Sequence, residues 1–332
     1  MSKLWMLPDG MEESLPQQAW RAESLRRALL DHYRGAGYEL ILPPFLEHLD
    51  SLLTGAGTDL DSLTFKLTDP ASGRLLGLRS DMTPQAARIA ARHFADQPVV
   101  RLCYLGTVLR TRPDALGGPR SPRQVGCELF GTPPGASALS ADLEVLSLML
   151  HTLRLAGVAE VHLDLGHVGV YRAVVEQLAL SAGDETALFD ILQRKSRPEL
   201  LGFAASLGIA ASAAEALQAL TTLHGDVTVL QTARRTLSRY GEGVATALAT
   251  LEAVIASVTK QHPALPLHLD LAELRGARYH TGLTFALFAP GHGRELARGG
   301  RYDGVGGEFG LARPATGFSA DVNELLRLGS MT

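Results

Sequence analysis

The sequence predicts an α+β fold in which an antiparallel sheet is flanked by helices and interrupted by a helical insertion. Short strand-like segments are joined by turns and hairpins rather than by regular helices, which argues against a doubly wound parallel sheet. Glycine becomes rare from residue 168 to 262, where alanine and leucine dominate. Strand-like alternation then returns over 266–326. We therefore expect one domain formed by 1–167 and 263–332, with a helical subdomain over 168–262.

The first elements are defined by their terminating residues. A helix is expected over 16–37, because Pro16 suits a first helical turn and Gly35 suits an end. A short strand should follow over 38–42 and stop at the proline pair 43–44. The later expected elements are a hairpin over 63–69 and 74–79, a helix from Thr83, strands over 99–110 and 123–130, a helix over 139–155, a strand over 160–165, and strands with a terminal helix in 266–326.

Composition excludes several classes of protein. The chain has 31 Lys+Arg and 35 Asp+Glu, a formal net charge of −4. This balance disfavours a basic nucleic-acid-binding module, which needs many clustered cations. Two cysteines, Cys103 and Cys127, cannot form a disulfide scaffold in 332 residues. The first residues lack the apolar core of a signal peptide, and no run of 18 apolar residues is present, so we expect a cytoplasmic protein.

Common catalytic and metal-binding motifs are missing from the sequence. There is no phosphate-binding P-loop, no H-E-x-x-H and no G-x-S-x-G. His162 and His167 form a weak candidate metal pair without carboxylate or cysteine neighbours at ligand spacing, so we expect structural histidines and no cofactor.

Two polar clusters are candidate ligand sites. Arginines gather in 101–128, and guanidinium groups suit carboxylate or phosphate, although a solvated basic loop is an equal alternative. They are Arg101, Arg110, Arg112, Arg120 and Arg123. Asp81 and Thr83 lie at a strand-to-helix turn, where they could bind an ammonium group or simply cap the helix. Eight glycines in 291–310 indicate a hairpin tip or a close approach of backbone to a ligand.

Taken in order, four motifs form a family signature. Residues 101–110 (RLCYLGTVLR) with 123–131 (RQVGCELFG) resemble motif 2 of histidyl-tRNA synthetase. Residues 274–282 (LRGARYHTG) and 299–304 (GGRYDG) resemble its two histidine-recognition motifs, and 314–318 (PATGF) resembles the start of motif 3. The resemblance covers nearly the whole chain. It implies the class II aminoacyl-tRNA synthetase fold and a homodimer formed near a motif-1 region around 38–50.

The resemblance also implies a histidine site. Asp81 and Thr83 would bind the α-ammonium with Gln124 beside them, Arg275 would pair with the α-carboxylate, and Glu128 would accept a hydrogen bond from the imidazole. The remaining implied ligand-binding residues are Arg110, Tyr279, His280 and Tyr302.

Departures from the family pattern favour a protein without synthetase activity. Glu324 occupies the position of the motif-3 arginine that holds ATP, and a carboxylate facing a triphosphate is repulsive. The Arg-x-Glu of motif 2 is Arg110-Thr111-Arg112 here, and the family's second tyrosine and aspartate after LRG become His280 and Arg278. The sequence also ends at Thr332, which we interpret as leaving no room for an anticodon-binding domain.

This combination resembles the regulatory subunits of ATP phosphoribosyltransferase, and residues 78–90 (LRSDMTPQAARIA) strengthen the match. The resemblance implies a non-catalytic, allosteric subunit in a hetero-oligomer. It would activate the short catalytic subunit in the first step of histidine biosynthesis and mediate feedback by histidine. One alternative is a truncated histidyl-adenylate-forming enzyme. Another is a stand-alone histidine-binding protein. Neither nucleic acid nor membrane is an expected partner.

Overall fold

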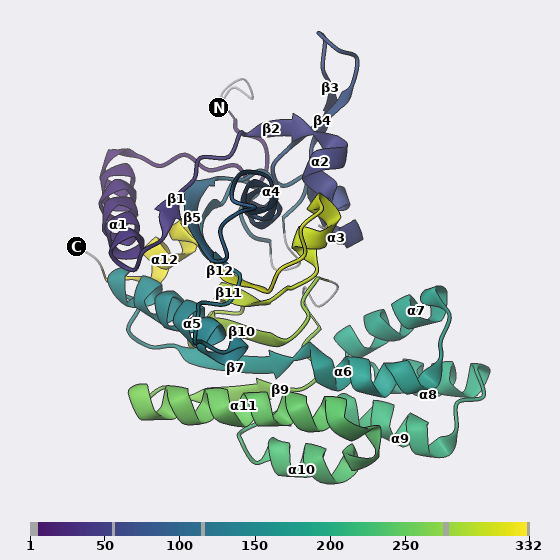
Figure 1. Ribbon diagram of the computed structural model, residues 1–332. Coiled ribbons are helices and arrows are strands. Elements are labelled where there is room, and N and C mark those ends of the chain that lie inside the picture. The colour runs from purple at the N-terminus through teal and green to yellow at the C-terminus, as the bar shows by residue number, and fades with distance from the viewer. Residues whose placement is uncertain (1–5, 55–56, 114–116, 275–278, 331–332) are drawn as a thin grey trace. The chain divides into compact units, whose positions relative to one another are not determined.

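The structure is a computed structural model that describes residues 6–54, 57–113, 117–274 and 279–330 (Figure 1). The chain divides into two compact units. The first unit contains residues 1–160, 291–299 and 303–332, and the second unit contains residues 161–290 and 300–302. Each unit is described separately below.

The first unit is built on strands in the order β1, β5, β6, β12 and β11. Strand β1 is Glu39–Leu40, β5 is Val100–Thr107, β6 is Arg123–Phe130, β12 is Ala315–Asp321, and β11 is Glu295–Arg301, whose last two residues belong to the second unit. The pairs β5–β6 and β6–β12 are antiparallel, as predicted, whereas β1 is parallel to β5. The strand predicted over 38–42 is shorter than expected, because Pro43 and Pro44 follow it closely.

Helices cover one face of these strands. Helix α1 (Pro16–Gly35) and helix α5 (Ala138–Leu155) meet where the Tyr33 hydroxyl lies 2.7 Å from the Thr152 hydroxyl. The Tyr33 ring also contacts Phe318 of β12 edge to face. Because side chains alternate across a strand, this face also takes Cys103 and Cys127, two buried free thiols at paired positions. The opposite face is left for Gln124, Glu128 and their neighbours.

Three smaller parts complete the first unit. Strands β2 (Leu46–His48), β4 (Leu75–Leu78) and β3 (Lys66–Thr68) form a separate antiparallel sheet, and β3 and β4 are the predicted hairpin. Helices α2 (Leu49–Leu53) and α3 (Gly57–Leu63) precede that hairpin and were not predicted. Helix α4 (Thr83–His93) starts at the predicted Thr83-Pro84, and helix α12 (Val322–Leu328) follows β12.

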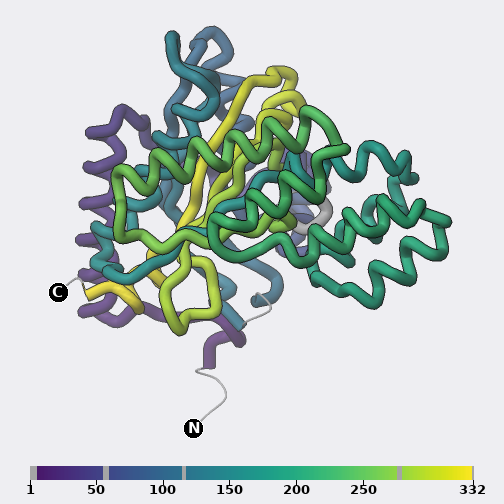
Figure 2. Tube along the Cα trace, turned by 90° about the horizontal axis from the view of Figure 1, so that it is seen from below, coloured from purple at the N-terminus to yellow at the C-terminus, as the bar shows by residue number. Residues whose placement is uncertain are grey.

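Over its described residues, the second unit combines short strands with six α-helices. Its strands follow the order β10 (Leu283–Phe288), β7 (His162–His167), β9 (Leu267–Asp270) and β8 (His224–Gly225), and β7 is parallel to β9. The helices are α6 (Val168–Val175), α7 (Ala182–Gln193), α8 (Arg197–Ser206), α9 (Ala211–Leu220), α10 (Val229–Thr236) and α11 (Gly241–Gln261), traced in teal and green in Figure 2. The helical subdomain expected over 168–262 remains a prediction. Within the second unit, α11 packs both on helix α6 and on strand β7.

Helix α11 bears on the expectation that nothing in the chain spans a membrane. Within the described residues, the stretch Ser238–Gln261 is long and apolar enough to do so by length and composition alone. Leu248, Leu251 and Val254 of this helix are fully buried, however. Of the most apolar part of this stretch, 33% is buried, and apolar helices that pack in the core of a protein share the composition of membrane spans.

Candidate ligand site

Asp81 lies at the turn between β4 and α4, which three hydrogen bonds fix, two of them to Gln124 of β6. The Gln124 amide donates to Asp81 Oδ1 at 2.8 Å, and the backbone N–H of Thr83 donates to the same oxygen at 3.0 Å. The Gln124 carbonyl oxygen in turn accepts from the backbone N–H of Met82 at 2.9 Å. Both the nitrogen and the oxygen of the Gln124 side-chain amide therefore help to fix the turn and orient Asp81, and the assignment of Gln124 as a histidine ligand stays a prediction.

Glu128 lies on the same face of the sheet as Gln124. Its neighbour on β5 is Tyr104, which donates a hydrogen bond from its hydroxyl to Glu128 Oε1 at 2.9 Å. The Thr83 hydroxyl lies 3.0 Å from the Tyr104 oxygen. Tyr104 and Glu128 are both buried. Thr83, Tyr104 and Glu128 thus form one connected chain of hydrogen bonds from the start of α4 to β6.

Two glycines make room for this chain. Gly126 pairs with Tyr104 across β5 and β6, and a Cβ atom at Gly126 would lie 2.5 Å from the Tyr104 hydroxyl oxygen. Gly317 of β12 pairs with Glu128, and a Cβ there would lie 1.6 Å from Glu128 Oε2. Side chains at either position would occupy the space of the hydrogen-bonded groups. The glycines of RQVGCELFG and PATGF therefore have a steric role in this site.

The electrostatic character of the site is negative. Burial raises the pKa of Tyr104 well above its ordinary value, and the nearby charges of Glu128 and Asp81 raise it further. Tyr104 therefore remains a protonated donor at neutral pH. Two carboxylates held on one face suit a ligand that carries an ammonium group and a second N–H donor.

The structure thus brings together four of the predicted ligand residues, Asp81, Thr83, Gln124 and Glu128, within the first unit. Sequence reasoning missed Tyr104, which joins two of them. Its position in the strand was the available signal. Residues two apart in a strand share a face, so Tyr104 lies with Leu102 and Gly106 on the face that holds Glu128.

Three other predicted residues belong to the second unit. The ring of Tyr279 lies 4.3 Å from that of His280 and 6.4 Å from that of Tyr302, measured between centroids. His280 and Tyr302 are buried, and Arg172 donates to the His280 carbonyl at 2.7 Å. A Cβ at Gly300 would lie 3.0 Å from His280 Nε2, so the glycine of GGRYDG allows this ring to pack. Arg275 and Arg278 lie outside the described residues.

The predicted arginine cluster is used mainly for structural contacts. Arg101 forms a bidentate ion pair with Glu144 at 2.7 and 3.0 Å. Arg120 donates to the backbone carbonyls of Arg110 and Asp9, and Arg123 donates to the Ser14 hydroxyl. Arg112 donates to the Ser62 hydroxyl. These side chains hold the N-terminal segment and neighbouring loops in place.

Arg110 lies near the carboxylate of Asp321, at the end of β12. Its positive charge lowers the pKa of Asp321, although burial dominates and raises that pKa to about 6. Arg110 therefore acts electrostatically on the end of β12, where the Asp321 side chain caps helix α12. Its assignment as a histidine ligand stays a prediction.

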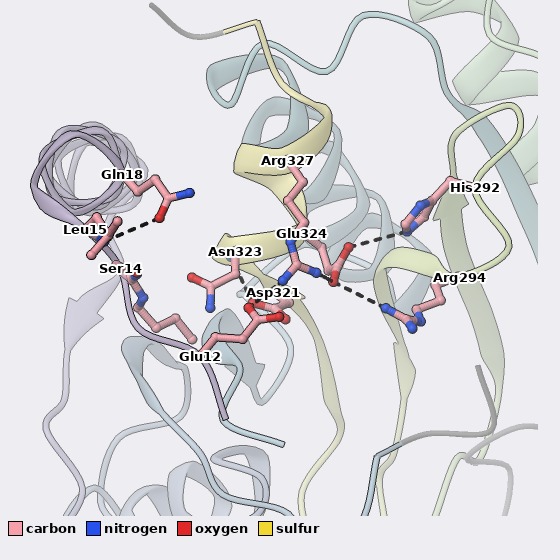
Figure 3. A network of polar contacts seen from close by, with 11 residues as sticks. Glu12, Ser14, Leu15, Gln18, His292, Arg294, Asp321, Asn323, Glu324 and Arg327 are labelled. Atoms are coloured by element: carbon pink, nitrogen blue, oxygen red, sulfur yellow. Dashed lines mark hydrogen bonds and ion pairs between the residues drawn. The ribbon is translucent and has the colours of Figure 1, made fainter. Parts of the chain in front are cut away.

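The Glu324 carboxylate lies among His292, Arg294 and Arg327 (Figure 3). It lies 3.4 Å from Arg294, 3.6 Å from His292, and forms a short ion pair with Arg327. Arg327 also contacts Glu12 of the N-terminal segment. At the position that the resemblance assigns to the motif-3 guanidinium, the chain thus has a buried carboxylate that contacts two arginines.

The histidines considered as a metal pair have other roles. His162 stacks on Phe288 with ring centroids 5.4 Å apart and lies 3.6 Å from Asp164. His167 accepts a hydrogen bond from the backbone N–H of Gly169 at the start of α6, and burial lowers its pKa to about 4. In the described part of the chain, no group of three or more His, Cys, Asp or Glu side chains could hold a metal ion.

Comparisons with known proteins identify the family. The family model described as histidyl-tRNA synthetase matches residues 10–325. An ATP phosphoribosyltransferase regulatory subunit of Thioalkalivibrio sulfidiphilus is 54% identical over 98% of this chain and 82% of its own length. One from Methylococcus capsulatus is 51% identical over 98% of this chain and 80% of its own length.

A solved structure extends the similarity to the fold. It is an ATP phosphoribosyltransferase regulatory subunit/histidyl-tRNA synthetase from Bacillus halodurans, which is 27% identical with a TM-score of 0.85. The match covers 99% of this chain and 85% of the other. The fold is therefore the predicted class II synthetase-like α+β fold. The chain belongs to the histidyl-tRNA synthetase-like family and, within it, to the regulatory subunits of ATP phosphoribosyltransferase.

Proposed function

We propose that this chain catalyses no reaction itself and activates a short catalytic ATP phosphoribosyltransferase subunit in the first step of histidine biosynthesis. Relatives that carry the name of the regulatory subunit are 54% and 51% identical over 98% of the chain. The observation that carries the non-catalytic assignment is Glu324, whose buried carboxylate stands where an adenylating enzyme needs a cation.

We further propose that the first unit binds free histidine, the product of the pathway. Asp81 and the Thr83 hydroxyl would accept hydrogen bonds from the α-ammonium, and Glu128 would accept one from the imidazole. Support comes from the fixed geometry of both carboxylates, since Gln124 orients Asp81 and Tyr104 orients Glu128. Roles for Arg110, Arg275, Tyr279, His280 and Tyr302 in binding histidine remain predictions carried over from the family resemblance.

The partner surface is also a proposal. Leu40, Leu42, Phe45 and Leu46 are exposed within the predicted motif-1 region, and Leu42 is 80% exposed. Contiguous exposed apolar side chains favour a protein interface. We propose that this region pairs two copies of the chain within a cytoplasmic hetero-oligomer.

Reconstitution tests the proposed function. Phosphoribosyltransferase activity of a short catalytic subunit should rise strongly when this chain is added, and the chain alone should show none. ATP–pyrophosphate exchange stimulated by histidine is the measurement for the alternative, a truncated adenylate-forming enzyme. Exchange above background would refute the non-catalytic assignment. A chain that binds histidine but leaves the catalytic subunit unchanged would instead be a stand-alone binding protein.

A further inference from the structure

Tyr104 connects the two carboxylate groups of the candidate histidine site. Its hydroxyl lies 2.9 Å from Glu128 Oε1 and 3.0 Å from Thr83 Oγ1, while Thr83 shares its turn with Asp81. The Tyr104 side chain is fully buried, so water does not compete for these bonds. A change in the position of Thr83 therefore alters the hydrogen bond that Glu128 receives, and a change at Glu128 alters the one at Thr83.

The hydrogen bonds have a fixed direction. A phenol carries one hydrogen, and a carboxylate can only accept, so Tyr104 donates to Glu128. The Thr83 hydroxyl must then donate its own hydrogen to the Tyr104 oxygen. This leaves Thr83 Oγ1 as an acceptor toward a ligand, as Asp81 and Glu128 are. The raised pKa of Tyr104 keeps its hydrogen in place at neutral pH.

The sheet is built to accommodate this arrangement. Gly126 and Gly317 are the positions on the neighbouring strands that face Tyr104 and Glu128, and a methyl group at either would overlap one of the two hydrogen-bonded groups. One orientation of Glu128 is thus set by both sterics and hydrogen bonding.

We propose that Tyr104 is a positioning residue that sets the specificity of this site for histidine by coupling recognition of the α-ammonium to recognition of the imidazole. This inference rests on the proposed histidine site. Tyr104 orients Thr83 as an acceptor for the ammonium and Glu128 as an acceptor for the imidazole N–H. A ligand that supplies both donors gains more than the sum of the two separate contacts.

The coupling is tested by comparing the affinities of two ligands for two proteins, the unchanged chain and Tyr104→Phe. Calorimetry on the full chain measures the affinity for L-histidine and for imidazole-4-propionate, which is histidine without its α-ammonium. Tyr104→Phe keeps the ring and removes the hydroxyl. It should lower the affinity for histidine about tenfold or more, which is the range for losing a hydrogen bond to a charged group. It should also shrink the preference for histidine over the analogue, because Thr83 no longer has a fixed direction.

Tyr38→Phe is the matched control. The Tyr38 hydroxyl is also buried in the first unit and donates to a carboxylate, that of Glu144, at 3.0 Å. This variant should lose similar stability yet bind both ligands as the unchanged chain does. An equal loss for histidine and the analogue in Tyr104→Phe would mean a merely structural role and would overturn the inference.

Two further results keep the test decisive. If Tyr104→Phe does not fold, Thr83→Val removes the donor at the other end, and Thr83→Ser restores it. Thr83→Val should weaken binding of the analogue, which has no ammonium for Thr83 to contact, and Thr83→Ser should not. Unchanged affinity of Thr83→Val for the analogue overturns the inference. If the unchanged chain binds no histidine, the proposed histidine site fails together with the inference. If the unchanged chain binds histidine and the variants keep its preference for histidine over the analogue, the inference is refuted and the proposed histidine site stands.

Discussion

Replacing Gly317 with alanine tests whether Glu128 has a single allowed position. The new Cβ would lie 1.6 Å from Glu128 Oε2 and 2.9 Å from the Cys127 carbonyl oxygen. A normal contact is roughly 3.2 Å or more, so the carboxylate must move by roughly 1.6 Å. Glu128 is 1% exposed and held by Tyr104 at 2.9 Å, so that movement breaks the hydrogen bond.

The expected magnitude combines two losses. Overfilling a packed site costs about 1–3 kcal/mol, and losing a hydrogen bond to a charged group costs about 1.5–3 kcal/mol. Gly317→Ala should therefore lower the free energy of unfolding by about 2–5 kcal/mol, because part of the strain relaxes. Histidine affinity should fall by about a hundredfold, since the imidazole acceptor is displaced.

Urea denaturation and calorimetry measure the two effects. Gly304→Ala is the control, because a Cβ at Gly304 meets nothing within 4 Å. Gly304→Ala should change the free energy of unfolding by less than about 1 kcal/mol. If Gly317→Ala folds as stably as the unchanged chain and binds histidine equally well, Glu128 is not fixed and the steric argument is wrong.

Three further outcomes follow from buried charges and from an open helix position. Burial raises the pKa of Asp321 to about 6 from 3.8, so the folded chain holds this proton more tightly than the unfolded chain, and stability falls as pH rises through that window. Asp321→Asn can still cap α12 and should remove this fall of the free energy of unfolding between about pH 4 and about pH 7, measured by urea titration. It should also stabilise the chain at neutral pH by about 2–3 kcal/mol. Glu324→Gln should lower the free energy of unfolding by about 2 kcal/mol and Glu324→Arg by more, because each removes the buried anion that Arg294 and Arg327 share. Equal stability of all three proteins would contradict this. Gly202 lies in α8 with nothing within 4 Å of an added Cβ, so Gly202→Ala should raise the free energy of unfolding by about 0.5–1 kcal/mol and the melting temperature with it. A lower melting temperature would contradict this.

Local patterns were sufficient to predict the main elements of the sheet. The termini of α1 and α5 and the strands β5 and β6 lie within a few residues of their predicted positions, because turn residues and apolar spacing are local signals. Strand β7 runs over 162–167 instead of the predicted 160–165, and α2 and α3 were missed. The last two are five and seven residues long, too short for a helical period to show in the sequence.

The site depended on long-range pairing that local patterns do not contain. Arg101 was grouped with anion-binding arginines because its partner Glu144 lies 43 residues away. Tyr104 was not singled out, because its role requires the register that sets it opposite Gly126 and next to Glu128. Glu324 was identified from the sequence as a departure from the motif-3 pattern, but its contacts with His292 and Arg294 depend on a segment about 30 residues earlier in the chain.

The most direct test of a non-catalytic, histidine-sensing subunit is the histidine inhibition curve of the reconstituted phosphoribosyltransferase complex. The curve is measured with the unchanged chain and with Glu128→Gln, which keeps the shape of a buried side chain and removes its charge. Both complexes should be active, since activation depends on the protein interface, and the variant should need at least about tenfold more histidine for the same inhibition. Equal sensitivity of the two complexes would place the inhibitory site on the catalytic subunit and contradict the account.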